Sequence, residues 1–375
     1  MAPTWLACRG AEKRGAAADE RDSNEAGPAE RSGGTPAARP LQLERLEVRG
    51  GARLRGQAHG AAHRDLIAGC VSSFMQQTAA LREKPEASLR WEQAVDAVAK
   101  KLGIDAPEAL EELEGIAAEA GVERAAHLAY ALEEDLLPEL DVALTRKRIE
   151  TWLASDVFAL PSHTGKVTRV VFRMASDGPL TLIDHVGELV ETPMLVLGRP
   201  GTLGCFGINR EGLACARQPM LDGRLAPEGS LSNAIFRQVL RAKNYREASH
   251  SVNDWLLKFG ASFFVADPEG AVAIESDTTS SRILGRFALS AIVAHTNHRI
   301  GPVPPDDALA QASLERLKVL RSLFPSGADP ALDKVIEKFQ AETKRPADQT
   351  PRLMFAANLK PSGTQLSWRS ELPTP

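Results

Sequence analysis

Hydrophobic residues in the first 150 positions recur mainly with the spacing of α-helices. A short, roughly alternating segment at 41–48 predicts one strand before them. Pro107 suits the first turn of a helix and Gly121 suits a helix end, which supports the bounds of one of these helices. We therefore predict a strand followed by an almost entirely helical half, with helices at 55–81, 89–102, 107–120, 124–136 and 144–153.

The pattern changes near Asp156 to short apolar runs that are separated by Gly, Pro and Asp. Such runs predict consecutive antiparallel strands, and 267–270 (DPEG) predicts a hairpin turn. Helical spacing returns at 231–242, 248–259, 308–323 and 331–341. Strands with inserted helices indicate an α+β layered fold. The predicted strands are 157–160, 167–172, 180–183, 193–197, 203–208, 213–216, 262–266, 272–275, 291–294, 352–359 and 365–369.

One predicted strand ends in four consecutive polar residues. The apolar run 291–294 leads directly into His295, Thr296, Asn297 and His298, and Gly301-Pro302 then breaks the chain. The end of a buried strand can deliver several hydrogen-bonding side chains to one place, where an active site can form. The simpler interpretation is a strand that leaves the core through a polar turn.

Composition places the chain among ordinary globular proteins and excludes several classes. Of its 375 residues 43% are hydrophobic and 25% charged, and the net charge of −4 argues against a nucleic-acid surface. No apolar run is long enough to span a membrane. The four cysteines are scattered without metal-binding spacing, which favours a reducing compartment, so we expect a cytoplasmic protein.

The first 40 residues differ from the rest in composition. They are rich in Ala, Gly, Pro, Arg and Glu and contain few large apolar residues, so we predict a disordered extension. Organelle targeting by this segment stays open. Its acidic residues match its basic ones in number, however, whereas transit peptides are poor in acidic residues.

Other chemical motifs in the chain are weak. His59 and His63 have the spacing of two zinc ligands on one helix, but no glutamate base lies between them and no third ligand is evident. Cys70 falls on the apolar side of a helical pattern, which favours a core position over a reactive thiol. A zinc hydrolase is therefore a minor alternative, and we expect no metal and no cofactor.

Several stretches together resemble one family. They are 46–60 with its RGQAHG helix entry, 112–122 (ELEGIAAEAGV), 200–214 (PGTLGCFGINREGLA), the helix at 230–241, HTNH at 295–298, and 314–317 (LERL). Their order and spacing resemble the acyl-coenzyme A:6-aminopenicillanate acyltransferase-like members of the N-terminal-nucleophile (Ntn) hydrolases, over about residue 41 to the end.

This resemblance implies a fold and a reaction. The fold is the Ntn αββα four-layer sandwich, with residues 41–154 as a helical N-terminal part and 155–375 as the core. The family cuts its own chain before a residue that then supplies both the nucleophile and, through its new α-amino group, the base. The substrate would be a small-molecule amide or acyl-CoA. Asn297 would donate to the oxyanion, and His295 and His298 would contact substrate.

The nucleophile position departs from the family pattern. The family has a Cys where this chain has Ser155, ahead of the predicted strand 157–160, and the strand that should follow is also divergent. An α-amine can activate a serine hydroxyl as well, so Ser155 is the candidate nucleophile and self-cleavage before it is expected. Two alternatives stay open: Ser155 is a turn or cap residue, and the protein is a catalytically inactive member that binds or scaffolds.

Overall fold

The structure is a computed structural model. It describes residues 43–152, 155–161, 168–175, 179–187, 192–220, 225–286, 292–300, 305–325, 328, 330–342, 352–360 and 364–371. The predicted N-terminal extension, 1–40, therefore lies outside the described residues.

The N-terminal part begins with the predicted strand and continues as helices, as the hydrophobic spacing indicated. Strand β1 (Leu43–Arg49) pairs in parallel with β4 (Leu180–Val186) and so joins the edge of a sheet formed by later residues. Helices follow, and all but the first of them contribute to one apolar cluster, which includes Phe74, Trp91 and Tyr130. They are α1 (Ala52–Ala62), α2 (Arg64–Gln77), the 3₁₀ turn η1 (Ala79–Arg82), α3 (Pro85–Asp105), α4 (Pro107–Ala120), α5 (Arg124–Ala131), α6 (Glu133–Leu140) and α7 (Val142–Trp152).

The helix predicted at 55–81 is broken at His63, where α1 ends and α2 begins. The helix predicted at 124–136 is likewise divided into α5 and α6 at Leu132. In both places the hydrophobic spacing continues across the break, so the sequence pattern did not reveal it. The bounds of α4 agree with the prediction, with Gly121 in the left-handed conformation that ends a helix.

Helices α1 and α4 pack with their backbones in close contact because glycines lie at the crossing. A Cβ on Gly56 would come within 2.0 Å of the Glu112 carbonyl oxygen, and a Cβ on Gly115 within 2.4 Å of the Arg53 carbonyl oxygen. Gly60 faces the same interface, where a Cβ would lie 2.5 Å from the Ile116 carbonyl oxygen. The glycines of the RGQAHG segment therefore serve helix packing.

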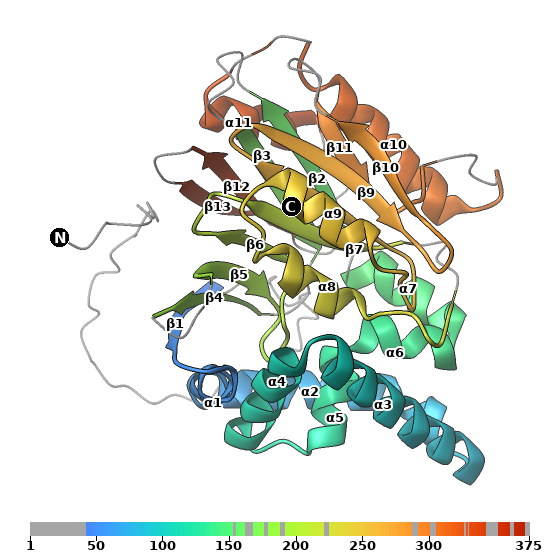
Figure 1. The fold of residues 1–375 in the computed structure, drawn as a ribbon. Helices are drawn as coiled ribbons and strands as arrows, with labels where there is room; N and C mark the ends of the chain where they lie inside the picture. Colours follow the sequence, from blue (N-terminus) through green and yellow to red (C-terminus); the bar gives the residue numbers. More distant parts are fainter. Residues whose placement is uncertain are drawn as a thin grey trace, which may run out of the picture.

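In the part of the chain that the structure describes, the strands form two sheets (Figure 1). The larger has the order β1-β4-β5-β6-β7-β8-β9-β10, and the smaller has the order β11-β2-β3-β12-β13. The remaining strands are β2 (Ser155–Pro161), β3 (Thr168–Ala175), β5 (Met194–Gly198), β6 (Phe206–Asn209), β7 (Ala214–Pro219), β8 (Ala261–Asp267), β9 (Gly270–Ser276), β10 (Ser281–Arg286), β11 (Val293–Thr296), β12 (Arg352–Leu359) and β13 (Gln365–Glu371).

The sheets pack face to face and helices cover both outer faces. Phe172 from the smaller sheet stacks on Phe206 from the larger one, with ring centroids 5.1 Å apart. Helices α8 (Ser232–Val239) and α9 (Tyr245–Asn253) cover the larger sheet, and α10 (Ala308–Ser322) and α11 (Leu332–Glu342) cover the smaller one. The α+β prediction and its αββα layering are therefore confirmed.

Alternating faces explain why the inner strands read as continuous apolar runs. Phe158 and Val171 point toward α10 and α11, whereas Val157 and Phe172 point toward the other sheet. Strand β10 was not predicted, because its residues, SRILGR, contain only two large apolar side chains. Strand β11 begins two residues later than predicted and includes His295 and Thr296.

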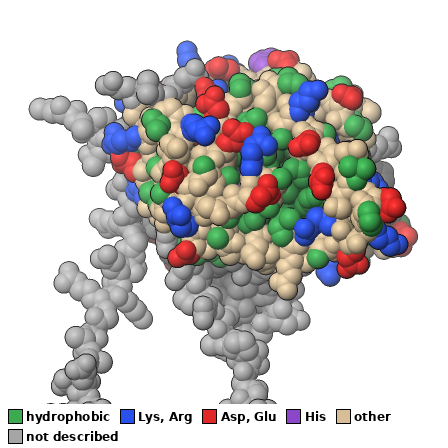
Figure 2. All heavy atoms as spheres, turned by 90° about the horizontal axis from the view of Figure 1, so that it is seen from below, with side chains coloured by type: hydrophobic (Ala, Val, Ile, Leu, Met, Phe, Trp, Pro, Cys, Tyr) green, Lys and Arg blue, Asp and Glu red, His purple; other side chains and the backbone are tan. Residues whose placement is uncertain are grey.

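Seen from the side of the helical part, the surface carries acidic and basic side chains in mixed positions around a cluster of hydrophobic ones (Figure 2). None of the described helices is both long and apolar enough to cross a membrane.

Candidate active site

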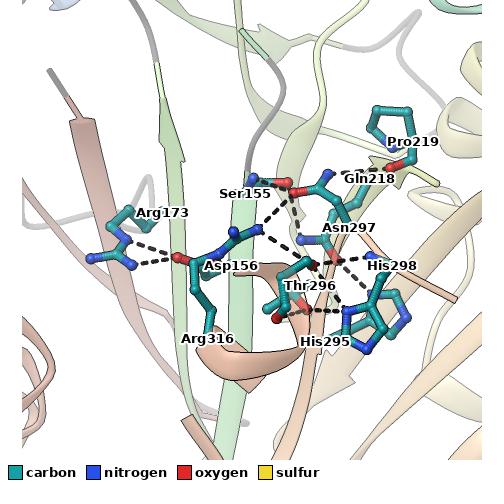
Figure 3. A network of polar contacts seen from close by, with 11 residues as sticks. Ser155, Asp156, Arg173, Gln218, Pro219, His295, Thr296, Asn297, His298 and Arg316 are labelled. Carbon is teal, nitrogen blue, oxygen red and sulfur yellow. Dashed lines mark hydrogen bonds and ion pairs between the residues drawn. The ribbon is translucent and has the colours of Figure 1, made fainter. Parts of the chain in front are cut away.

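Ser155 is the first residue of β2, which lies between β11 and β3 in the smaller sheet. Its main-chain N–H donates to Oδ1 of Asn297 over 2.8 Å, and its hydroxyl oxygen accepts from Nε2 of Gln218 over 3.0 Å (Figure 3). Only 3% of the residue is exposed. Leu153 and Ala154 lie outside the described residues. The predicted nucleophile and the predicted oxyanion donor are thus in direct contact.

Asn297 follows the last residue of β11, which runs antiparallel to β2 with His295 opposite Val157 and Thr296 opposite Asp156. This register carries the residue after Thr296 to the start of β2. The Asn297 amide nitrogen donates to the Pro219 carbonyl oxygen at the end of β7, over 3.2 Å. Asn297 therefore links the ends of strands from both sheets, which explains why a polar residue can be buried there.

Asp156 anchors the start of β2 through two arginines. Nε of Arg173, the opposite residue on β3, donates to Oδ2 over 3.0 Å, and Nε of Arg316 on α10 donates to Oδ1 over 2.7 Å. Nη2 of Arg316 also lies 3.4 Å from Oδ1 of Asn297. The three charged side chains sum to one positive charge within the candidate site, and Asp156 and Arg173 are almost completely buried.

His295 belongs to a buried hydrogen-bond chain that ends at Ser155. Its Nε2 lies 3.0 Å from Oε1 of Glu275, and its Nδ1 lies 2.9 Å from the Ser262 hydroxyl and 3.2 Å from Oε1 of Gln218. A proton on Nε2 can be donated to Glu275, and without a proton Nδ1 can accept from Ser262. A hydrogen bond from the ring to Oε1 of Gln218 requires a proton on Nδ1, because an amide oxygen only accepts. The same Gln218 donates to the Ser155 hydroxyl. His295 thus reaches the candidate nucleophile through Gln218.

His298 lies on the other side of the strand end. Its Nδ1 is 3.1 Å from the Thr296 hydroxyl and 3.0 Å from the Ser313 hydroxyl of α10, and its main-chain N–H donates to the same Ser313 oxygen. Burial, followed by the charge of His295, lowers the pKa of His298 to about 4. Both histidines predicted to contact substrate are therefore buried in the network around Asn297, with exposed fractions of 0% and 2%.

The two histidines with zinc-ligand spacing have other contacts. Nε2 of His59 accepts from the main-chain N–H of Gly201 over 3.2 Å, and the His59 and His63 rings meet edge to face. His127 completes the arrangement, because its Nε2 lies 2.9 Å from the Gly201 carbonyl oxygen and donates to it. The residues that the structure describes contain no group of three or more His, Cys, Asp or Glu side chains placed to hold a metal.

The described cysteines lie away from the candidate nucleophile position. Burial raises the pKa of the Cys205 thiol to about 12 and also raises that of Cys215, so neither supplies a thiolate at neutral pH. Cys70 is only partly buried and lines a cavity beside α2.

The sequence did not reveal several residues of this network, among them Asp156, Arg173, Gln218 and Arg316. Arg173 left one signal, a charged residue within the apolar run VVFRMA. A charge in such a run requires a buried partner. Gln218 lies at the end of its strand, and Arg316 belongs to an amphipathic helix with other charged residues, so neither is distinctive.

Comparison with known proteins agrees with the resemblance seen in the sequence. The model of the family described as "Acyl-coenzyme A:6-aminopenicillanic acid acyl-transferase" matches residues 191–352. This confirms the predicted resemblance over the part of the chain that carries Asn297 and Arg316. No curated protein matches the sequence.

Among solved structures, penicillin V acylase from Agrobacterium tumefaciens is similar to this chain. The identity is 11% and the TM-score 0.37, over 57% of this chain and 85% of the acylase.

Proposed function

We propose that this protein is an amide hydrolase or acyltransferase of the Ntn type, which acts through an acyl-enzyme formed on Ser155. The match of residues 191–352 to the acyltransferase family model supports the class of reaction. The contact between Ser155 and Asn297 carries the assignment to this site. It joins the residue at the family's nucleophile position to the residue at its oxyanion position, over 2.8 Å.

The first reaction would take place within the chain itself. The Ser155 hydroxyl attacks the carbonyl carbon of Ala154, the peptide C–N bond breaks, and the Ser155 nitrogen leaves as an amine. Water then hydrolyses the resulting ester, which leaves a carboxylate on Ala154 and restores the hydroxyl. The products are residues 1–154 and 155–375, and Ser155 now carries a free α-amino group.

In the second reaction the new amine serves as the base. An α-amino group has an ordinary pKa of about 7.7–8.0, so a useful fraction is neutral near pH 7.5 and can take the proton from the hydroxyl. Oδ1 of Asn297, which already accepts from the Ser155 nitrogen, would hold that amine in place. The positive charge shared by Arg173, Arg316 and Asp156 would further favour the neutral form of the amine.

Stabilisation of the oxyanion would come from the other end of the Asn297 side chain. Because Oδ1 accepts from Ser155, the NH₂ group would be the donor. One of its two hydrogens binds the Pro219 carbonyl oxygen, so the oxyanion would take the second. A single such donor accounts for about 3–4 kcal/mol of transition-state stabilisation. The acyl group then passes to water in a hydrolase or to an amine in an acyltransferase.

The experiment that tests the proposal is intact-mass analysis of the purified full-length chain. We expect two fragments that separate between Ala154 and Ser155, a single uncut chain for Ser155→Ala, and cleavage again for Ser155→Cys. Ser249→Ala serves as the matched control, because it removes another mostly buried hydroxyl, on α9.

An alternative function is that of an inactive family member that binds or scaffolds. The burial of Ser155 favours this alternative, because a nucleophile must meet its substrate. A wild-type chain that stays uncut, with Ser155→Ala unchanged in all measured properties, would rule out the enzyme and support the scaffold.

A further inference from the structure

A cavity of about 350 Å³ lies between α2, α5, α7 and the segments that flank β4 and β5. Its volume is within the range of small-molecule sites. Most of its wall is apolar or aromatic, with Leu66, Phe74, Tyr130 and Pro179 among the lining residues. Two guanidinium groups, of Arg148 and Arg199, complete the wall, so the cavity combines an apolar body with a cationic region.

The two arginines share one carboxylate. Nε of Arg148 donates to Oε2 of Glu133 over 2.8 Å, and Nη2 of Arg199 lies 2.6 Å from Oε1 of the same group. All three residues are at least nine-tenths buried, with exposed fractions of 5%, 8% and 1%. Together these three side chains carry one positive charge in a place where water contributes little screening.

The other acidic groups nearby face different partners. Glu134 pairs with Arg217, and Asp135 accepts from Ser232 and Asn233 at the start of α8. Asp65 also lines the cavity, but it is exposed to solvent. Among the residues that the structure describes, the charge balance at the buried end of the cavity therefore favours an anion.

Both guanidinium groups are held in fixed planes by aromatic rings. Cζ of Arg199 lies 4.7 Å from the centre of the Tyr130 ring, and Cζ of Arg148 lies 5.3 Å from that of Phe74. Nη1 of Arg148 also donates to the Gln77 side chain over 2.5 Å. A guanidinium held in this way recognises a carboxylate with little loss of side-chain freedom.

Arg148 places the cavity near the candidate active site. This residue and Pro219 also line a small void of about 10 Å³. The Pro219 carbonyl oxygen accepts from the Asn297 amide, and α7, which carries Arg148, ends three residues before Ser155.

A second, larger cavity lacks the net positive charge of the cavity beside α2. About 470 Å³ in volume, it also has two arginines, Arg55 and Arg237, on one carboxylate, Glu112. Its wall, however, includes three further acidic residues and only one further arginine. These are Asp105, Glu108, Glu111 and Arg241. Glu108, Glu111 and Arg241 are exposed, as Asp65 is in the first cavity, but Asp105 is a second buried carboxylate. The buried charges of this cavity therefore cancel, and it does not share the preference for an anion.

We propose that the cavity beside α2 binds a small apolar molecule that carries a carboxylate, with Arg148 and Arg199 facing the carboxylate. Binding in the cavity can be measured without turnover, so this site is tested independently of the proposed function.

The test is calorimetric titration of the full chain with 4-phenylbutyrate and with its neutral counterpart, 4-phenylbutyramide. We expect the carboxylate to bind at least tenfold more tightly than the amide. Arg199→Met should abolish this preference and leave amide binding unchanged, because Arg148 and Glu133 then form a neutral pair. Glu133→Gln should increase the preference, since it removes the shared negative charge.

Two further variants locate the binding. Leu66→Trp fills the cavity and should weaken both ligands, whereas Arg237→Met, the matched change in the larger cavity, should affect neither. Equal affinity for the two ligands, or loss of binding in Arg237→Met but not in Leu66→Trp, would overturn the proposal. Carboxylate binding by a chain that neither cuts itself nor turns over amides would leave this site standing and refute the proposed function alone.

Discussion

The main-chain nitrogen of Ser155 and the side-chain oxygen of Asn297 are 2.8 Å apart, although 142 positions separate them in the sequence. The bond fixes which end of the Asn297 amide faces which partner. The side-chain oxygen of Asn297 accepts from the main-chain nitrogen of Ser155. The side-chain NH₂ group, which also donates to the Pro219 carbonyl oxygen, is the end that can donate to an oxyanion. The same contact can persist when the peptide N–H becomes an amine, so one geometry serves both the uncut and the cut chain.

Replacing Asn297 separates its role as acceptor for the Ser155 nitrogen from its role as donor to the oxyanion. Asn297→Asp keeps an acceptor for the Ser155 nitrogen but removes the NH₂ donor, so we expect kcat to fall about 10²–10³-fold, as for loss of one oxyanion donor. Asn297→Ala removes both roles and should also slow self-cleavage, followed by mass spectrometry over time. Wild-type rates in Asn297→Asp would show that the side chain is not the oxyanion donor.

Arg173 should stabilise the fold strongly through Asp156. Arg173→Met leaves a buried carboxylate with Arg316 as its remaining arginine partner among those described above, and breaking a buried pair costs about 3–5 kcal/mol. We expect a loss in the free energy of unfolding near the lower end of that range, measured by urea denaturation. Lys318→Met, which disrupts an exposed pair with Glu315, is the control and should change stability by less than about 1 kcal/mol.

Buried histidines should make the protein unstable in mild acid. Burial, the largest cause in each case, lowers the pKa of His59 to about 3 and those of His127 and His298 to about 4. In the unfolded chain each titrates near 6.5, so below that pH the unfolded state binds protons that the folded state does not.

The resulting loss of stability begins as the pH falls through 6.5. It continues to about pH 4 for His127 and His298 and to about pH 3 for His59. Chemical denaturation at a series of pH values measures it. In His127→Gln the loss over this window should be smaller than in the wild type. An unchanged pH dependence in that variant would show that His127 takes up its proton in the folded state.

The contact between α1 and α4 should tolerate no side chain at Gly56. Gly56→Ala places a Cβ 2.0 Å from the Glu112 carbonyl oxygen, so the helices must separate, which we expect to cost at least about 1–3 kcal/mol. Gly69→Ala is the matched control in a neighbouring helix. A Cβ there meets nothing within 4 Å, and the change should stabilise the protein by about 0.5–1 kcal/mol. Thermal unfolding of both variants tests the pair.

The features of the fold that could be predicted are marked by residues close in the sequence. The features that could not be predicted depend on contacts with residues far away in the sequence. Helix α4 was predicted to its ends because Pro107 and Gly121 mark them within the sequence. The break at His63 was not, and its neighbour His59 bonds to Gly201, which is 142 residues away. No spacing rule within the helix contains that information.

The same distinction applies to the candidate site. Asn297 was selected as a candidate because it follows an apolar strand within a dense polar motif and because that motif resembles one of the acyltransferase-like family. Gln218 and Arg316 reach Ser155 and Asp156 from β7 and α10, and only the register of the sheets and the position of α10 bring them there. Their roles could not be derived from the hydrophobic pattern, which specifies layers but not the side-chain pairs between them.

The position of β2 has a thermodynamic consequence. Ser155 begins a strand that lies between β11 and β3, so a cut before it removes no strand from the sheet. The helical part would still be held to the core by buried ion pairs such as Arg217 with Glu134 and Arg237 with Glu112. After cleavage, however, the folded molecule is a complex of two chains. Its midpoint of unfolding should then rise with protein concentration, as that of the uncut chain should not.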